Sequence, residues 1–453
     1  MDILTIEVGS TITKANGFDF RPGGALRHVA QGFAKTSVAS GDVGVGVAEA
    51  VAALEKALGS PVGEPETFVN SSAAGGLRMT VHGLTYSMTA RAAHEASLGA
   101  GAIVKLVTAG PLEPYDLDAI RETAPTITVL AGGVEGGERA IVLRNAERLA
   151  SMGLGAPVIY AGNSDLRRPV EKVFREAGAE LLVVDNVFPE VDELDVEPLR
   201  RGIQEVFGRH IVRAPGMSRF EGMSPWGIMP TPGAVLRGAE LFAEALGDCL
   251  VFDVGGATTD VHSVTDGSPE LRDKAVEPEP RAKRTVEGDL GVFVNAENVV
   301  RMAGDSAWEA RMGDLRAMPE TERERELTRW LCARAVDAGA KRHAGRLTDL
   351  FTPTGRRRIL KGKDLSAVRW VVATGGALTR IEGAADCLRS ICVGAKSHLL
   401  PPPDARILVD RDYRFSALGT VAQAHPEEVK RTFEAWVAAE LEAARDKEMR
   451  HAI

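Results

Sequence analysis

The chain has 453 residues, of which 44% are hydrophobic and 26% charged, and its formal net charge is -9. This length allows two or three domains with cores of their own, and the negative charge, without a basic run interleaved with aromatics, argues against nucleic-acid binding. Four scattered cysteines without CxxC spacing indicate neither a disulfide framework nor a metal cluster, and no apolar run is long enough for a membrane span, so we expect a cytoplasmic protein with no membrane association.

The first predicted element is a hairpin with a glycine turn at residues 3–14. An apolar strand reaches an acid, Glu7, and is followed by a glycine, hydroxyl residues and a returning strand. Such a turn directs several backbone N–H groups at one point, which is an arrangement that binds phosphate oxygens. The candidate phosphate donors are Gly9, Ser10, Thr11, Thr13 and Lys14.

The rest of the first predicted domain alternates between strands and helices. Residues 27–38 predict a strand, and residues 43–58 carry apolar side chains at helical spacing. A strand at 66–70 leads into a segment of small residues at 71–77. An Ala-rich helix at 89–98 and a strand at 103–108 follow, and we place the first domain at residues 1–125.

The pattern changes to strict strand–helix alternation in residues 126–215. Buried strands separated by helices predict a parallel sheet with crossover helices, and we expect an inserted α/β subdomain here. Ligands of such sheets lie beyond the carboxyl ends of the strands. One of these ends is the glycine-rich segment 132–137, and its acid, Glu135, is a candidate catalytic residue. The predicted strands lie at 127–131, 158–161 and 181–185, and the helices at 138–152 and 166–177.

A connection and a helix occupy residues 216–248, and a second domain is expected at 249–453. Its first element repeats the N-terminal hairpin, because the strand 250–252 reaches Asp253 and then a glycine turn. A carboxylate at the mouth of such a turn can hold a hydrated Mg²⁺ or orient a water molecule. Taken alone, the segment is better explained as an ordinary hairpin with a glycine turn. The candidate phosphate-binding residues are Gly255, Gly256, Ala257, Thr258 and Thr259.

The second domain continues with a charged helical region at 319–347, whose alternating charges indicate a solvated face. A buried strand at 370–374 then ends in Gly375, Gly376 and Ala377. An amphipathic helix is expected at 427–451.

Two similar hairpins near the starts of the two halves, with a late strand that ends in a double glycine, form an internal duplication. This set resembles the actin-like ATPase superfamily, which includes sugar kinases and DnaK-type chaperones. The resemblance implies an α/β fold of two duplicated ribonuclease-H-like domains with the inserted subdomain, and it implies ATP and Mg²⁺ as ligands. In that superfamily the hairpins grip the phosphates, and the late glycines lie against the adenosine. Asp253 and Glu7 would hold Mg²⁺ through water, although Glu7 stands where the superfamily usually has aspartate.

Segments over most of the chain resemble a narrower family, the accessory proteins of the glutamate mutase operon (the mutase-L family). The resemblance implies an ATP-driven chaperone that reactivates an adenosylcobalamin-dependent mutase by promoting exchange of damaged cobalamin. The chain has no Asp-x-His-x-x-Gly motif, so cobalamin binding would belong to the mutase subunits. The segments that carry the resemblance are 6–14, 71–77, 128–137, 253–260, 283–291 and 374–377.

Two other functions fit the same pattern. A small-molecule kinase of this fold would need an acceptor site, which the region 126–211 could supply, and a screen of sugars and small acids would reveal it. A nucleotide-gated interaction or filament module would show little turnover but would assemble in the presence of ATP. An oligomer is compatible with each of the three functions.

Overall fold

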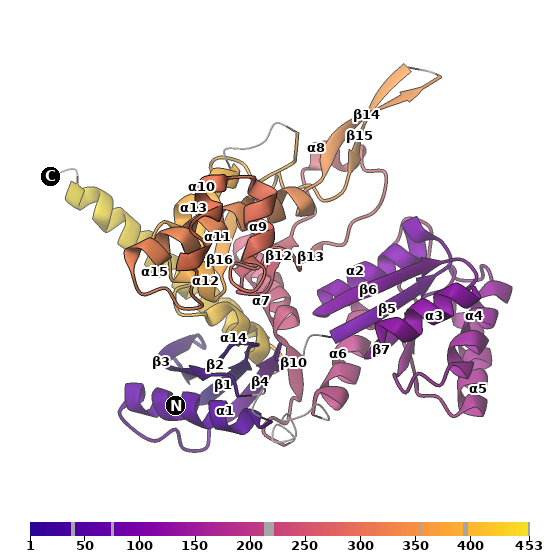
Figure 1. The fold of residues 1–453 in the computed structure, drawn as a ribbon, viewed down its shortest axis with the longest axis horizontal. Coiled ribbons are helices and arrows are strands. Elements are labelled where there is room, and N and C mark those ends of the chain that lie inside the picture. The colour runs from indigo at the N-terminus through magenta and orange to yellow at the C-terminus, as the bar shows by residue number, and fades with distance from the viewer. Residues whose placement is uncertain (38–40, 74–76, 213–221, 354, 393–396, 452–453) are drawn as a thin grey trace.

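Two five-stranded sheets of the computed structural model share one topology (Figure 1). The structure describes residues 1–453 except 38–40, 74–76, 213–221, 354, 393–396 and 452–453. The first sheet has the order β10-β4-β1-β2-β3 and the second has the order β13-β12-β11-β16-β17. In each sheet, the first three strands in chain order pair with one another as an antiparallel meander. The two later strands run parallel to the first strand, on its other side. This repeat confirms the duplication and the actin-like ATPase fold.

The central strands are apolar because both faces of each sheet are covered. All six residues of β1 are buried, and the core of β11 is equally apolar. The strands of the first sheet are β1 (Ile3–Val8), β2 (Ile12–Phe20), β3 (Leu26–Lys35), β4 (Glu66–Ser71) and β10 (Ile228–Pro230). Those of the second are β11 (Cys249–Val254), β12 (Thr259–Val264), β13 (Ala282–Glu287), β16 (Trp370–Thr374) and β17 (Arg406–Val409).

A layer of helices joins the two sheets through a shared core. Side chains of α7 (Thr231–Leu246), α14 (Arg414–Val421) and α15 (Pro426–His451) pack together with residues of both sheets, including Ile3 and Val251. The other helices of the two domains are α1 (Val43–Leu58), α8 (Pro269–Arg272), α9 (Ala296–Ala303), α10 (Ser306–Glu309), α11 (Glu322–His343), α12 (Gly376–Thr379) and α13 (Ala384–Cys392).

The third large sheet belongs to the insertion and is parallel throughout, as predicted. Its order is β6-β5-β7-β8-β9, and it lies apart from the two duplicated sheets (Figure 1). Its strands are β5 (Leu77–Gly83), β6 (Ala102–Ala109), β7 (Ile127–Leu130), β8 (Val158–Tyr160) and β9 (Leu181–Val183). Its helices are α2 (Arg91–Gly99), α3 (Pro114–Thr123), α4 (Ala140–Ser151), α5 (Arg167–Ala177) and α6 (Glu197–Ile211).

The sheet places the start of this inserted domain earlier than residue 126. Strand β5 pairs with both β6 and β7, so a division after residue 125 would cut through one sheet. We therefore begin the inserted domain at about residue 77. The small-residue segment 71–77 leads into it. Residues 74–76 of that segment lie outside the described residues, as do 216–221 of the predicted connection.

The long charged helix is shorter than the predicted 319–347. A capping box fixes its start, because the Thr321 side chain accepts from the Glu324 backbone and the Glu324 side chain accepts from that of Thr321. Its end at His343 is followed by a two-stranded hairpin, β14 (Arg346–Thr352) and β15 (Gly355–Lys361), which projects from the second domain (Figure 1). Within the described residues, no helix combines the length and apolar character needed to cross a membrane.

The inserted domain should lose stability in mild acid because of His82. This side chain is fully buried between the hydroxyls of Thr80 and Thr108, and burial lowers its pKa from 6.5 to about 3. The unfolded chain therefore binds the proton more tightly than the folded one, so stability is retained above pH 6.5 and falls as the pH drops toward 3. Between pH 6.5 and 5, we expect His82 to account for a loss of about 2 kcal/mol.

Denaturant unfolding of the wild type and of His82→Gln, at pH 7 and at pH 5, measures this contribution. Glutamine keeps a polar group between the two threonines but does not titrate. The variant should lose less stability than the wild type over this range, and equal losses would contradict the assignment.

Candidate functional site: a cleft between the duplicated domains

A cleft of about 710 Å³ is lined by both duplicated domains and by Gly101 and Ile103 of the inserted domain. This volume is in the range of sites that bind small molecules and cofactors. The cleft brings together thirteen of the residues predicted from the sequence: Glu7, Gly9, Ser10, Thr11, Lys14, Asp253, Gly255, Gly256, Ala257, Thr258, Gly375, Gly376 and Ala377.

The two glycine turns are closed by equivalent backbone hydrogen bonds. The N–H of Gly9 donates to the carbonyl of Ile12 at 3.0 Å, and the N–H of Gly255 donates to the carbonyl of Thr258 at 2.9 Å. A Cβ at Gly9 would lie 2.7 Å from the Ile12 oxygen, so the first turn requires glycine. The duplication therefore extends from the sheet topology to the turns that line the cleft.

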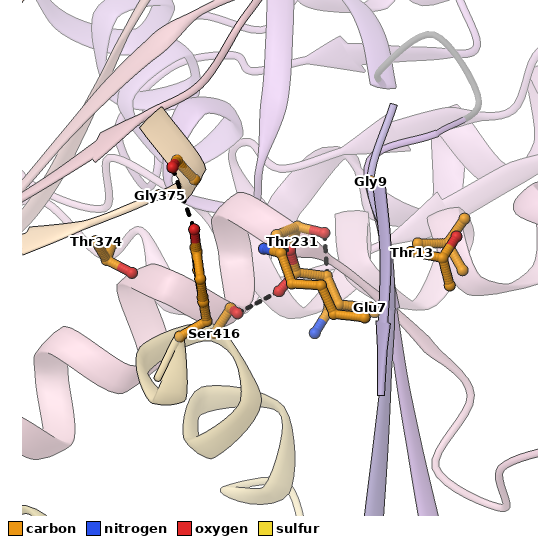
Figure 2. A network of polar contacts seen from close by, with 12 residues as sticks. Glu7, Gly9, Thr13, Thr231, Thr374, Gly375 and Ser416 are labelled. Carbon is orange, nitrogen blue, oxygen red and sulfur yellow. Dashed lines mark hydrogen bonds and ion pairs between the residues drawn. The ribbon is translucent and has the colours of Figure 1, made fainter. Parts of the chain in front are cut away.

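Lys14 is held by an acid on the neighbouring strand. Its Nζ lies 2.5 Å from Oε1 of Glu7, and the Ser416 hydroxyl donates to Oε2 of the same carboxylate (Figure 2). Burial alone would lower the pKa of Lys14, but the charge and hydrogen bond of Glu7 raise it. Both oxygens of Glu7 are engaged in the structure, and the metal and catalytic roles predicted for this residue stay predictions. Its role in the structure is to orient a charged lysine.

Asp253 is the acid that remains available to a ligand. Burial, together with the nearby charge of Asp260, raises the pKa of Asp253 to about 7. Among the described residues, none donates a hydrogen bond to this carboxylate. The backbone of Gly375 lies against it. A Cβ at Gly375 would be 2.3 Å from Oδ1 of Asp253, and this glycine has a φ of +86°.

The described residues contain no group of three or more His, Cys, Asp or Glu side chains that could hold a metal ion. A cation bound at Asp253 would therefore take most of its ligands from water and from a bound phosphate, as Mg²⁺ does in many nucleotide sites.

Three predicted site residues do not line the cleft. Thr13 is buried and its hydroxyl lies 3.1 Å from that of Thr36, while the Thr259 hydroxyl donates to the carbonyl of Leu290 at 2.8 Å. Their side chains are structural because residues along a strand alternate between its two faces.

The third of these residues, Glu135, lies at the carboxyl edge of the inserted sheet. It accepts hydrogen bonds from Ser164 and from Asn186 Nδ2, the latter at 2.8 Å. Partial burial would raise the pKa of Glu135, but these hydrogen bonds lower it. It is not among the residues that line the cleft, so the catalytic role predicted for it is wrong for this site.

Several residues that complete the cleft were not predicted from the sequence. Tyr413 precedes α14 with a left-handed φ of +52°, and its hydroxyl donates to the carbonyl of Gly376 at 3.2 Å. Lys14 Nζ lies 4.5 Å from the centre of the Tyr413 ring, and the Arg380 guanidinium lies 5.6 Å from it. Non-glycine residues in this backbone region are strained and cluster at functional sites. Further lining residues missed in the sequence are Thr231, Arg284, Arg316, Arg325, Thr374 and Ser416.

The chain is similar to known proteins in sequence and in structure. The family model described as "MutL protein" matches residues 3–437. Protein MutL of Clostridium tetanomorphum is 35% identical over 454 residues, which cover 94% of this chain and 97% of that protein. Among solved structures, nucleotide-free acetone carboxylase has a TM-score of 0.41 at 14% identity, over 93% of this chain and 70% of that one. Nucleotide-free diol dehydratase-reactivating factor has a TM-score of 0.38 at 12% identity, over 94% and 100% of the two chains. By the family model and the Clostridium relative, the chain belongs to the MutL family of glutamate mutase-associated proteins.

Proposed function

We propose that this protein is an ATP-hydrolysing chaperone that reactivates an adenosylcobalamin-dependent mutase, either glutamate mutase or a related aminomutase. It would promote the exchange of damaged cobalamin held by the mutase subunits. The observation that carries the proposal is the pair of equivalent glycine turns on one cleft, in a chain of the MutL family. The four cysteines are free and buried, which is compatible with action in the reducing cytoplasm.

The residues of the cleft fit ATP and Mg²⁺. The backbone N–H groups of the turns at 9–11 and 255–258 would hold phosphate oxygens, and Lys14 would add positive charge. Gly375, Gly376 and Ala377 would lie along the adenosine, and Asp253 would bind the hydrated cation. When bound, MgATP supplies a phosphoanhydride bond whose hydrolysis can drive a conformational change.

Gly256→Val should weaken ATP binding by at least about tenfold. A Cβ at Gly256 would touch only Cβ of Phe293, at 3.3 Å, so the fold should tolerate the change while the branched side chain occupies space in the cleft. Calorimetric titration with ATP measures the effect. Gly313→Val is the matched control, because a Cβ at this exposed glycine of the same domain meets open space. If Gly256→Val binds ATP with the affinity of the wild type, the second glycine turn is not part of the ATP site.

Release of a tightly bound, spent cofactor requires a coupled input of free energy. ATP can supply it only if the ATP-bound and ADP-bound forms of the chaperone bind the mutase with different affinity. A nucleotide that contacts both duplicated domains can produce such a difference by favouring a closed arrangement of the cleft.

The proposal is tested by reactivation of an inactive mutase. Glutamate mutase, or an aminomutase encoded beside this gene, is inactivated with hydroxocobalamin and then mixed with this protein, ATP, Mg²⁺ and fresh adenosylcobalamin. We expect mutase activity to recover with ATP and not with ADP, and expect affinity for the mutase to differ between the two nucleotides. If ATP has no effect on recovery, the chaperone function is wrong. ATP-dependent phosphorylation of a small molecule would instead favour the kinase.

A further inference from the structure

One buried arginine of the second domain contacts both the sheet behind the cleft and the inserted domain. Arg284, on β13, is only 2% exposed. Its Nε donates to Oδ1 of Asp260 at 2.8 Å, and its Nη2 lies 2.5 Å from the same oxygen. Its Nη1 donates to two backbone carbonyls of the inserted domain, those of Leu98 at 2.8 Å and Ala102 at 2.9 Å.

The carboxylate at the other end of this contact belongs to the cleft. Asp260 lies on β12, is 6% exposed and lines the cleft. Its Oδ2 accepts a hydrogen bond from the hydroxyl of Thr258 at 3.2 Å, and Thr258 is part of the second glycine turn. A continuous chain of hydrogen bonds therefore runs from this turn through Asp260 and Arg284 to the inserted domain.

The carbonyls that receive Arg284 lie where the inserted domain reaches the cleft. Leu98 is near the end of α2, and Ala102 is the first residue of β6. Between them, Gly101 has a φ of +100°, and it lines the cleft together with Ile103. A shift of Arg284 would therefore act on the junction between α2 and β6.

Three other polar contacts join the inserted domain to β13 and to the segment just before it, and their residues do not line the cleft. Lys283 Nζ lies 3.5 Å from Glu95 and Arg200 donates to the carbonyl of Ala282 at 2.7 Å, both on β13. Arg91 lies 3.1 Å from Glu279, which precedes the strand. Polar interfaces between domains allow relative motion more readily than large apolar ones. These contacts hold the inserted domain against the edge strand of the second sheet, whereas Arg284 also touches a cleft residue.

We propose that Arg284 is a positioning residue that couples the nucleotide in the cleft to the placement of the inserted domain. The inference rests on the proposed function, because it takes a nucleotide as the ligand of the cleft. A phosphate that binds at the second turn changes the hydrogen bonds of Thr258 and hence those of Asp260. The rigid fork of the guanidinium carries this change to the carbonyls of Leu98 and Ala102. The placement of the inserted domain against the second sheet then differs between the empty and the nucleotide-bound protein.

Hydrogen–deuterium exchange of the full chain tests this coupling. Exchange of peptides that cover 91–109 is measured without nucleotide and with saturating MgADP or a non-hydrolysable ATP analogue with Mg²⁺. In the wild type, we expect nucleotide to change the exchange rates of these peptides by at least about twofold. In Arg284→Lys, the charge opposite Asp260 is kept, but the planar fork that joins the carboxylate to both carbonyls in a fixed geometry is removed. Because Arg284 also lines the cleft, the affinity of the variant for nucleotide is measured first by calorimetric titration. At a nucleotide concentration that saturates the variant, the response of 91–109 should be lost.

Arg91→Gln is the matched control, because it removes an ion pair of the same interface that does not involve the cleft. It should keep the nucleotide response of 91–109. The coupling is overturned if Arg284→Lys keeps this response, or if the wild type binds nucleotide without any response there. A wild type that binds no nucleotide would overturn the proposed function itself, and the coupling with it. If Arg284→Lys fails to fold by circular dichroism, the double variant Arg284→Met with Asp260→Asn removes both buried charges and is tested in the same way.

Discussion

Asp253→Asn should reduce ATP turnover by roughly 10²–10³-fold, the usual effect of removing one preorganised electrostatic group. Asp253 lines the cleft, and no other described residue donates a hydrogen bond to its carboxylate, so that carboxylate is available for a hydrated cation. Asparagine has nearly the same shape but lacks the negative charge that would hold Mg²⁺. The backbone donors of the two turns remain, and ATP affinity should therefore fall much less than turnover.

Steady-state phosphate release and calorimetric titration, both in MgATP, measure the two quantities separately. Asp404→Asn is the matched control, since Asp404 is an exposed carboxylate of the same domain and does not line the cleft. Its turnover should equal that of the wild type. Equal losses of affinity and turnover in Asp253→Asn would indicate a collapsed cleft. If turnover were unchanged, Asp253 would have no part in ATP hydrolysis.

The parts of the cleft that lie in short contiguous segments could be predicted from the sequence. Each glycine turn follows its strand and acid within a few residues, and the same pattern recurs near the start of the second half. The duplicated sheets confirm that pattern. Within these segments the prediction was wrong at Thr13 and Thr259, because a run of hydroxyl residues does not show which side chains point away from the cleft.

Residues that reach the cleft from distant segments could not be predicted. Ser416 contacts Glu7 across 409 positions of the chain, and Arg284 contacts Leu98 across 186. No local pattern marks such pairs, because they depend on how whole domains pack. The start of the inserted domain was also predicted wrongly, because its strand–helix alternation begins at β5 and not at residue 126.

The helices between the two sheets depend on glycine at their closest approach. A Cβ at Gly419 of α14 would lie 1.8 Å from the carbonyl oxygen of Ala234 on α7, and a Cβ at Gly238 of α7 would lie 2.9 Å from the carbonyl oxygen of Phe415. Backbone atoms cannot yield as the end of a flexible side chain can. Any side chain at Gly419 must therefore push the two helices apart.

Gly419→Ala should lower the free energy of unfolding by about 3 kcal/mol, the upper end for an overpacked core. It should also weaken ATP binding, because α14 carries Ser416 and α7 carries Thr231, which both line the cleft (Figure 2). Denaturant unfolding and calorimetric titration measure the two effects. Gly208→Ala in α6 is the control, since its Cβ would make an ordinary contact of 3.6 Å and alanine favours a helix by up to about 1 kcal/mol. If Gly419→Ala were as stable as this control, the close packing of α7 and α14 would not hold the two domains together, and the contact between Ser416 and Glu7 would need another support.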